Sequence, residues 1–217
     1  HADAEVIIEA LWSFTRELAD LIKADEDGIW AFIVRNAYRP AMLKHHFDYI
    51  VGNPPWLSYR FIKQRDYQEE VKRRVVQQYK LAPLDENNRV RQSLLTQMEL
   101  ATVFLAHALT QFGSSTAKLA FVMPRAVLTG DQHERLRSRT YDGTKAPFTI
   151  TRFWDLMKVQ PLFNVPSCVL FAKRQRPKWT AAGYELPVRV FSGDLPVRNL
   201  PWKQANEHLK IRKRTGR

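Results

Sequence analysis

The sequence predicts an α/β fold, and three features indicate it. Two apolar runs, Phe47 to Gly52 and Leu119 to Met123, are each followed by proline, as expected of buried strands that end abruptly. A helical stripe at 94–112 separates these runs, so we expect the two strands to pair in parallel. Two later runs, 148–156 and 167–172, have no room between them for a crossover helix and should pair antiparallel.

The remaining elements follow from periodicity. Apolar residues recur three and four apart between Val6 and Leu21, which predicts an amphipathic helix, and 29–38 is a second apolar segment. A helix is expected from about Asp66, with the cations at 72–74 on its outer face, where they either contact phosphates or are simply solvated. A short helix should run through 131–139.

Three regions are expected along the chain. Residues 1–46 form an N-terminal helical segment, 47–175 contain the predicted strands and their helices, and 176–217 form a basic extension with β-structure. The 217 residues are enough for one domain with an ample core.

Composition narrows the classes of function. The formal net charge is +12 and the pI is near 10.0, so the surface attracts polyanions, of which nucleic acid is the commonest. No apolar run is long enough to span a membrane, and a single cysteine, Cys168, fits a reducing cytoplasm. Cys168 lies in an apolar run, which indicates packing. His45 and His46 have no cysteine or glutamate at ligand spacing, so no metal site is expected.

The turn after the first strand carries the clearest chemistry. Pro54 and Pro55 have no N–H, so the backbone there offers carbonyl acceptors, and the Asn53 side chain adds another acceptor. Trp56 places a flat ring beside them. Carbonyl acceptors beside an aromatic side chain are the groups needed to bind a planar exocyclic amine: the acceptors bind its hydrogens, and the side chain stacks on the ring to which the amine is attached. A plain X-Pro-Pro turn with Trp56 in the core is the alternative.

These four residues resemble the catalytic motif of amino methyltransferases that use S-adenosylmethionine, above all the N6-adenine DNA methyltransferases. Further stretches in the same order resemble later motifs of that family: 98–109, Phe121-Val122-Met123-Pro124, and 155–173 with Pro161-Leu162-Phe163 inside. The details look most like the long adenine methylases of restriction-modification or phage-defence systems. The resemblance implies the second half of a Rossmann-like methyltransferase fold, ending in an antiparallel strand pair.

The resemblance also implies roles for residues. The target adenine would be flipped out of double-stranded DNA, with Asn53 and the Pro54 carbonyl accepting its amino hydrogens. Trp56 would stack on the base and Phe163 would cover its opposite face, although Phe163 is equally compatible with the core. Tyr59 would contact the base or the backbone, or else pack within its loop. Other subunits of the defence system are expected partners.

One element of the family is missing from the sequence. The glycine-rich loop that holds the methyl donor precedes the catalytic turn in enzymes of this order, but only Gly28 and Gly52 occur before Asn53. The chain is therefore expected to be a catalytic-half fragment.

Three other functions fit the same residues. A similar turn occurs in enzymes that methylate a protein glutamine or an RNA amine. Without the donor site, the polypeptide could instead be a non-catalytic nucleic-acid-binding module. A further possibility, DNA cleavage by a longer parent protein, has no support in these residues, because the sequence contains no convincing Pro-Asp…Glu-x-Lys nuclease cluster.

Overall fold

The computed structural model describes residues 2–23, 36, 39–40, 42–178 and 185–216. The chain divides into two compact units, His1–Lys44 and His45–Arg217. In the first unit, α1 (Ala2–Lys23) confirms the predicted N-terminal helix. The second predicted segment, 29–38, lies outside the described residues apart from Asn36.

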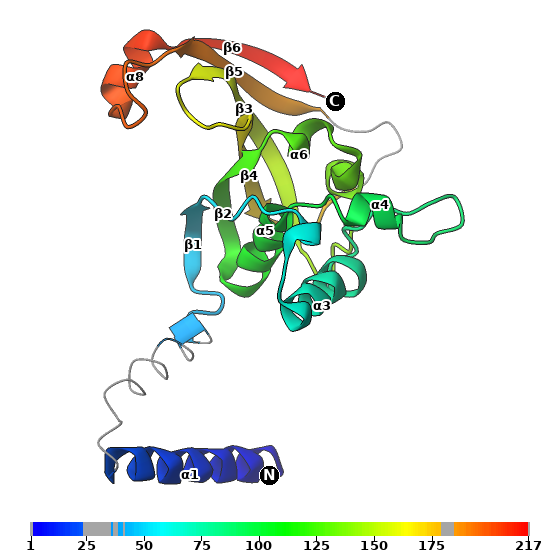
Figure 1. The fold of residues 1–217 in the computed structure, drawn as a ribbon, viewed down its shortest axis with the longest axis vertical. Helices are drawn as coiled ribbons and strands as arrows, with labels where there is room; N and C mark the ends of the chain where they lie inside the picture. The colour runs from blue at the N-terminus through cyan, green and yellow to red at the C-terminus, as the bar shows by residue number, and fades with distance from the viewer. Residues whose placement is uncertain (1, 24–35, 37–38, 41, 179–184, 217) are drawn as a thin grey trace. The chain divides into compact units, whose positions relative to one another are not determined.

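The second unit is built on a six-stranded mixed sheet in the order β1-β2-β4-β3-β5-β6 (Figure 1). Its strands are β1 (Phe47–Gly52), β2 (Gly113–Pro124), β3 (Phe148–Gln160), β4 (Ser167–Arg174), β5 (Leu186–Asp194) and β6 (Lys210–Gly216). The parallel β1–β2 pair and the antiparallel β3–β4 pair confirm the predicted pairings, and with them the α/β class. The C-terminal segment adds two strands to the same sheet, because β5 pairs in parallel with β3 and β6 pairs antiparallel with β5.

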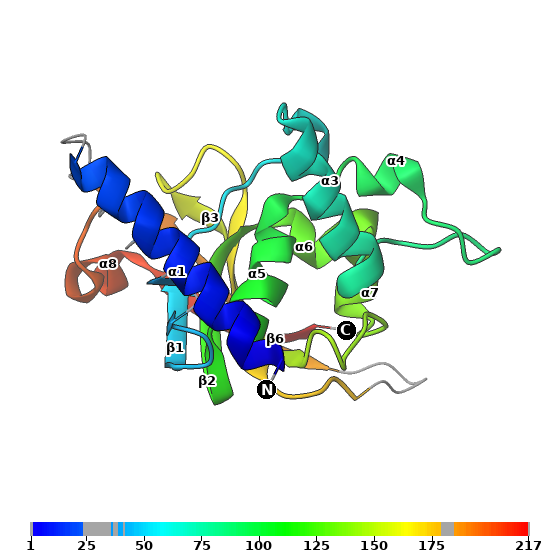
Figure 2. The same ribbon diagram turned by 90° about the horizontal axis from the view of Figure 1, so that it is seen from below.

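Most helices lie on one side of this sheet (Figures 1 and 2). They are η1 (Tyr59–Phe61), α3 (Arg65–Arg73) with its π-helical continuation η2 (Arg74–Gln78), α4 (Gln92–Leu95), α5 (Leu100–Gln111), α6 (Ala126–Thr129), η3 (Asp131–His133) and α7 (Glu134–Arg137). Helix α8 (Trp202–His208) lies apart from them, near the ends of β3 and β5. The prediction of one helix over 94–112 is wrong. Glu99 adopts an extended backbone (φ −81°, ψ 141°), because it forms a β-bridge with Ser58, and this ends α4 and starts α5.

The main core lies between α5 and the sheet. Leu105 and Leu109 of α5 are buried together with Leu119 and Met123 of β2 and Leu170 of β4, and each of these side chains is at most 2% exposed. A second, smaller core joins α8 to the ends of β3 and β5 through Val159, Phe191, Leu195 and Ala205. Close packing of this kind fixes the central strands against α5 and the ends of β3 and β5 against α8.

The expectation that 47–52 is a buried strand is also wrong. Only Ile50 packs against the main core, whereas Tyr49 is 71% exposed and Val51 is 80% exposed. A continuous apolar run predicts burial on both faces, but β1 is an edge strand and no described residue of the second unit covers its other face.

Candidate active site at the end of strand β1

The turn of residues 53–56, which we call the catalytic turn after the role expected from its sequence, leaves the sheet where β1 ends. Gly52 lies opposite Phe121 of β2, and a Cβ at Gly52 would lie 3.3 Å from the Phe121 ring. After it, Asn53 is exposed, Pro54 is buried and Pro55 is exposed. No described residue hydrogen-bonds the Asn53 side chain, so its carbonyl oxygen is free to accept from a ligand.

Trp56 is held in place by the neighbouring strand. Its indole Nε1–H donates a hydrogen bond of 3.2 Å to the carbonyl oxygen of Val122 in β2, and its ring packs against the main core. A half-buried Trp with its N–H satisfied has a defined orientation. The indole therefore forms a rigid wall beside Asn53.

Phe163 lies directly against this wall. The two ring centroids are 5.1 Å apart and the ring planes are inclined by 48°. A base stacked between two rings needs them about 7 Å apart, twice the ~3.5 Å contact distance. The structure therefore brings the two predicted aromatics together but leaves no gap for a base between them. Phe163 is 40% exposed and sits on the 161–166 loop, so it is the ring that can move aside.

Tyr59 belongs to a segment that is tied to the start of α5. Its N–H donates to the Met98 carbonyl at 2.9 Å, and the Leu100 N–H donates to the Leu57 carbonyl at 2.8 Å. The Tyr59 ring packs against the main core, and burial, aided by the charge of Glu69, raises the pKa of its hydroxyl. The side chain is therefore neutral at physiological pH.

A buried polar pair lies behind this segment. Glu99 Oε2 is 2.5 Å from Nε2 of His133, and Nδ1 of the same imidazole is 3.1 Å from the Thr102 hydroxyl. Burial raises the pKa of Glu99, but the hydrogen bond and charge of His133 outweigh it, and the net pKa is lowered. Sequence inspection missed this pair because its members are separated by 34 residues. The only local signal was a carboxylate inside an otherwise apolar helical stripe.

A second ion pair supports the Phe163 loop. Arg125, which directly follows β2, places Nε 3.1 Å from Oδ2 of Asp155, and its backbone N–H donates to the Pro166 carbonyl at 2.8 Å. The loop is thus fixed at its C-terminal end to the strand beside the catalytic turn. Arg125 was not among the predicted site residues, and no local pattern distinguishes it from other surface arginines.

The described residues contain no group of three or more His, Cys, Asp or Glu side chains that could hold a metal ion. Nor do they form a glycine-rich cradle for a nucleoside methyl donor, since β1 itself is the first strand of the unit and lies at the sheet edge. The Asn53 carbonyl can accept from an amine, a ring attached to that amine can stack on Trp56 once Phe163 moves aside, and the part of the chain described does not complete a donor site.

An exposed amide acceptor on a proline turn, at the end of a strand in a mixed α/β sheet, is an arrangement to which an amine can donate its hydrogens. The sequence model of the Eco57I restriction-modification methylases matches residues 5–153, well over half of the chain. The chain therefore belongs to the Eco57I restriction-modification methylase family, whose members require a methyl donor.

Comparison with solved structures finds restriction-modification enzymes. The type IIG restriction endonuclease BpuSI shares 18% identity at a TM-score of 0.43, over 81% of this chain and 20% of the endonuclease. A DrdV–DNA complex shares 12% identity at a TM-score of 0.44, over 83% of this chain and 18% of that protein. The ATP-dependent type ISP restriction-modification enzyme LlaBIII bound to DNA shares 11% identity at a TM-score of 0.42, over 86% of this chain and 13% of that protein. This chain thus spans a fifth or less of each of these proteins.

None of the curated protein sequences compared with this chain matches it significantly. Within the part of the chain that the structure describes, no helix is both long enough and apolar enough to cross a membrane.

Proposed function

We propose that this chain carries the catalytic turn of a site-specific DNA methyltransferase that transfers the methyl group of S-adenosylmethionine to N6 of adenine. The observation that carries the proposal is the exposed, unpartnered Asn53 amide beside the anchored Trp56 ring, at the end of β1. Membership of the Eco57I restriction-modification methylase family supports it.

The residues of the turn would hold the amine. An adenine amino group has two hydrogens, and the Asn53 carbonyl oxygen and the Pro54 backbone carbonyl each accept one of them. With both hydrogens held in this way, the nitrogen lone pair would be left free to attack an electrophile. Holding the two reactants in line supplies most of the acceleration in such a transfer.

The base would reach the turn by leaving the duplex, because its amino nitrogen is paired and inaccessible in the stack. Trp56 would then stack on one face of the adenine. Since Phe163 contacts Trp56 in this structure, entry of the base requires the Phe163 ring to move outward by the thickness of a base. Tyr59 borders the same turn and would contact the base or the adjoining backbone.

When bound, S-adenosylmethionine would supply an electrophilic methyl group, and the role of this chain would be to hold and orient the amine that receives it. The glycine-rich loop that binds the methyl donor is proposed to lie outside the described residues, as expected for a catalytic-half fragment. The exposed edge and outer face of β1, with Tyr49 and Val51, provide a place where such a segment would pack.

The experiment is methyl transfer from labelled S-adenosylmethionine to unmethylated DNA, by a protein that contains this chain and a donor-binding region. Digestion should recover the label in N6-methyladenosine. Asn53→Ala is expected to abolish transfer without changing the circular dichroism spectrum, while Asn87→Ala, a matched change in an exposed loop, should retain it. Unchanged transfer by Asn53→Ala would refute the assigned role. Label in RNA or a protein glutamine instead would refute adenine as the acceptor.

A further inference from the structure

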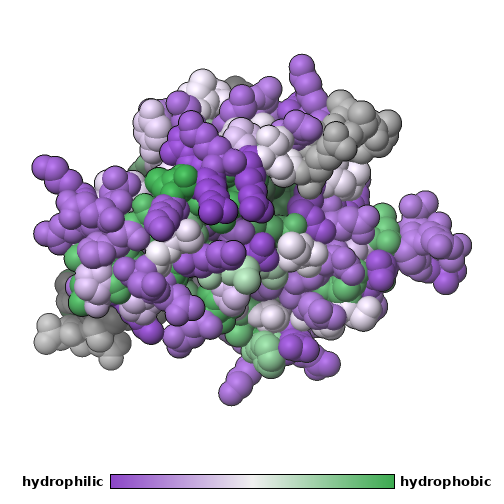
Figure 3. Space-filling model, turned by 90° about the horizontal axis from the view of Figure 1, so that it is seen from above, coloured by the Kyte–Doolittle hydropathy of each residue, from purple (hydrophilic) through white to green (hydrophobic). Residues whose placement is uncertain are grey.

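Strand β6 has the highest density of positive charge in the sheet. Four of its seven residues are cations, Lys210, Arg212, Lys213 and Arg214, and all four are exposed. The strand pairs with β5 along one edge only, and its other edge is unpaired among the described strands. Seen from above, where β5, β6 and α8 are uppermost in Figure 1, hydrophilic side chains predominate (Figure 3).

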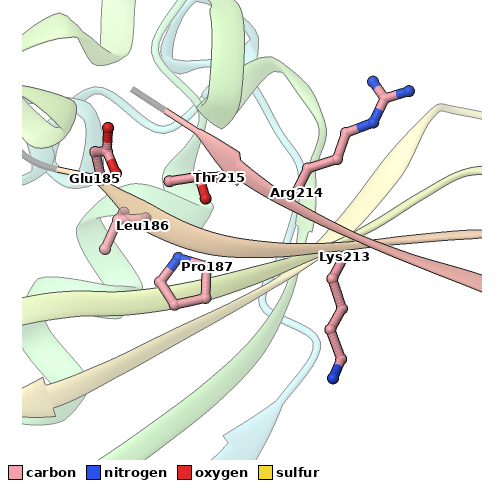
Figure 4. A pocket seen from close by; sticks show the side chains of 6 residues that line it. All are labelled: Glu185, Leu186, Pro187, Lys213, Arg214 and Thr215. Carbon is pink, nitrogen blue, oxygen red and sulfur yellow. The ribbon is translucent and has the colours of Figure 1, made fainter.

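The cations are sorted onto the two faces of the strand. Successive residues point to opposite sides, as Lys213 and Arg214 do in Figure 4, so Lys210, Arg212 and Arg214 share one face. Lys158 of β3 joins this set, because Lys158 and Lys210 both lie opposite Ser192 of β5. We call Lys158, Lys210, Arg212 and Arg214 the basic face.

Little negative charge offsets the basic face. None of its four side chains forms an ion pair within the described residues. Asp155, which lies in the same row as Arg212, is already engaged by Arg125. Glu185 lines an open pocket of about 470 Å³ that Arg214 also borders (Figure 4). Like charges held in a row repel one another, and binding of a polyanion relieves that repulsion.

The basic face is attached rigidly to the loop that carries Phe163. Strands β3 and β5 are parallel and end together, where the Leu195 N–H donates to the Gln160 carbonyl at 2.5 Å. Gly193 has a φ of 150°, and a side chain there would clash with the His208 carbonyl, so β5 and the end of α8 approach closely. The segment after β5 also reaches the loop, since Arg198 donates to Asn164 Oδ1 at 3.4 Å.

The topology places one end of the basic face at the same end of the sheet as the catalytic turn, although β6 and β1 form opposite edges of the sheet. Strand β6 runs antiparallel to β5, so Lys210 lies at the sheet edge where β3 ends and the 161–166 loop begins, and Arg214 lies farther away. A ligand bound along β6 would therefore extend outward from the side of the 161–166 loop, whose Phe163 contacts Trp56.

We propose that the basic face binds the phosphate backbone of duplex DNA, on the flank of the adenine presented to the catalytic turn. The orientation of the DNA rests on the proposed function, whereas phosphate binding by this face does not. Alternate residues of a strand are ~6.8 Å apart, so the three cations of β6 span ~14 Å. Each DNA strand carries one charge per ~3.4 Å of helix axis, so this span faces about four phosphates of one strand.

The test compares two variants with equal charge. One carries Lys210→Gln, Arg212→Gln and Arg214→Gln. The other carries Arg89→Gln, Arg91→Gln and Lys145→Gln, three exposed cations that lie away from β6. Anisotropy of a fluorescent duplex gives Kd for each protein between 50 and 200 mM salt. All three altered residues of β6 are exposed, and a urea titration verifies that both variants fold.

Removal of three phosphate-binding cations from β6 should reduce the slope of log K against log salt by ~2.7. The unaltered chain is then expected to lose about 40-fold more affinity than the β6 variant over this fourfold rise in salt. The control variant should keep most of the original slope. Arg212→Lys with Arg214→Lys should also keep it, because binding a phosphate needs the charge rather than the guanidinium fork.

Equal slopes for the β6 variant and the unaltered chain would overturn the proposal, leaving these cations as protection of an exposed strand edge. Equal reductions of the slope in both variants would also overturn it, because the effect would then be one of net charge. Tighter binding of single-stranded RNA than of duplex DNA would refute DNA as the partner. Failure of the proposed function is distinguishable, because Asn53→Ala should lose methyl transfer while its salt dependence of binding stays unchanged.

Discussion

The Glu99–His133 pair should determine how firmly the segment after the catalytic turn is held. The Glu99 backbone bridges Ser58, while its carboxylate contacts an imidazole that is 2% exposed. Glu99→Ala removes the carboxylate and leaves His133 buried beside a void. Removal of one partner of a buried charged pair costs about 3–5 kcal/mol. The Glu99 side chain is 13% exposed, so we expect about 3 kcal/mol, the lower end of that range.

Glu99→Gln tests the same contact without creating a cavity. The amide oxygen can still accept a hydrogen bond from His133, so only the charge is lost, and the free energy of unfolding should fall by about 1.5 kcal/mol. Glu86→Ala provides the control, since this carboxylate is exposed in the loop before α4 and its loss should change stability by less than ~0.5 kcal/mol. Urea unfolding at pH 7 measures all three free energies of unfolding.

The pH dependence gives a second, independent measure. Because the folded-state pKa of Glu99 lies below its ordinary value of 4.5, the stabilisation is fully present above pH 4.5. It is lost as pH falls through the lowered pKa, when the folded carboxylate takes up a proton. The unaltered chain should therefore lose more stability than Glu99→Gln between pH 5 and strongly acidic conditions. Parallel pH profiles, or a Glu99→Ala cost no larger than that of Glu86→Ala, would refute the reasoning.

Two further predictions concern the strands that carry the turn. Gly52→Ala places a methyl group 3.3 Å from the buried Phe121 ring, so we expect the free energy of unfolding in urea to fall by about 1 kcal/mol. An unchanged unfolding midpoint would contradict this, because it would show that the Phe121 ring shifts at no cost. Burial, with the charge of Asp155, raises the pKa of the Cys168 thiol to about 12, so the folded chain should react very slowly with a disulfide reagent at pH 8 and rapidly in urea. Equal rates in the two conditions would contradict the buried position of the thiol.

The catalytic turn and the strands around it could be predicted from the sequence because their causes are local. Two prolines end β1 wherever it lies, and another proline is the last residue of β2. The short connection between β3 and β4 allows only an antiparallel pair, and that pair is observed. The absence of backbone donors at Pro54 and Pro55 likewise follows from covalent structure alone.

Tertiary structure decided the features that depend on distant neighbours. The run 47–52 has the composition of a buried strand, but it lies at a sheet edge, and a strand's position in a sheet is set by pairing across the chain. Glu99 interrupts a helical stripe because Ser58, 41 positions earlier, pairs with its backbone. The Arg125–Asp155 and Glu99–His133 pairs join residues 30 and 34 positions apart. The start of the basic strand β6 reaches the end of the sheet that carries the 161–166 loop only because β3 and β5 end together. Local propensity contains none of this information, since each contact forms only when the whole sheet assembles.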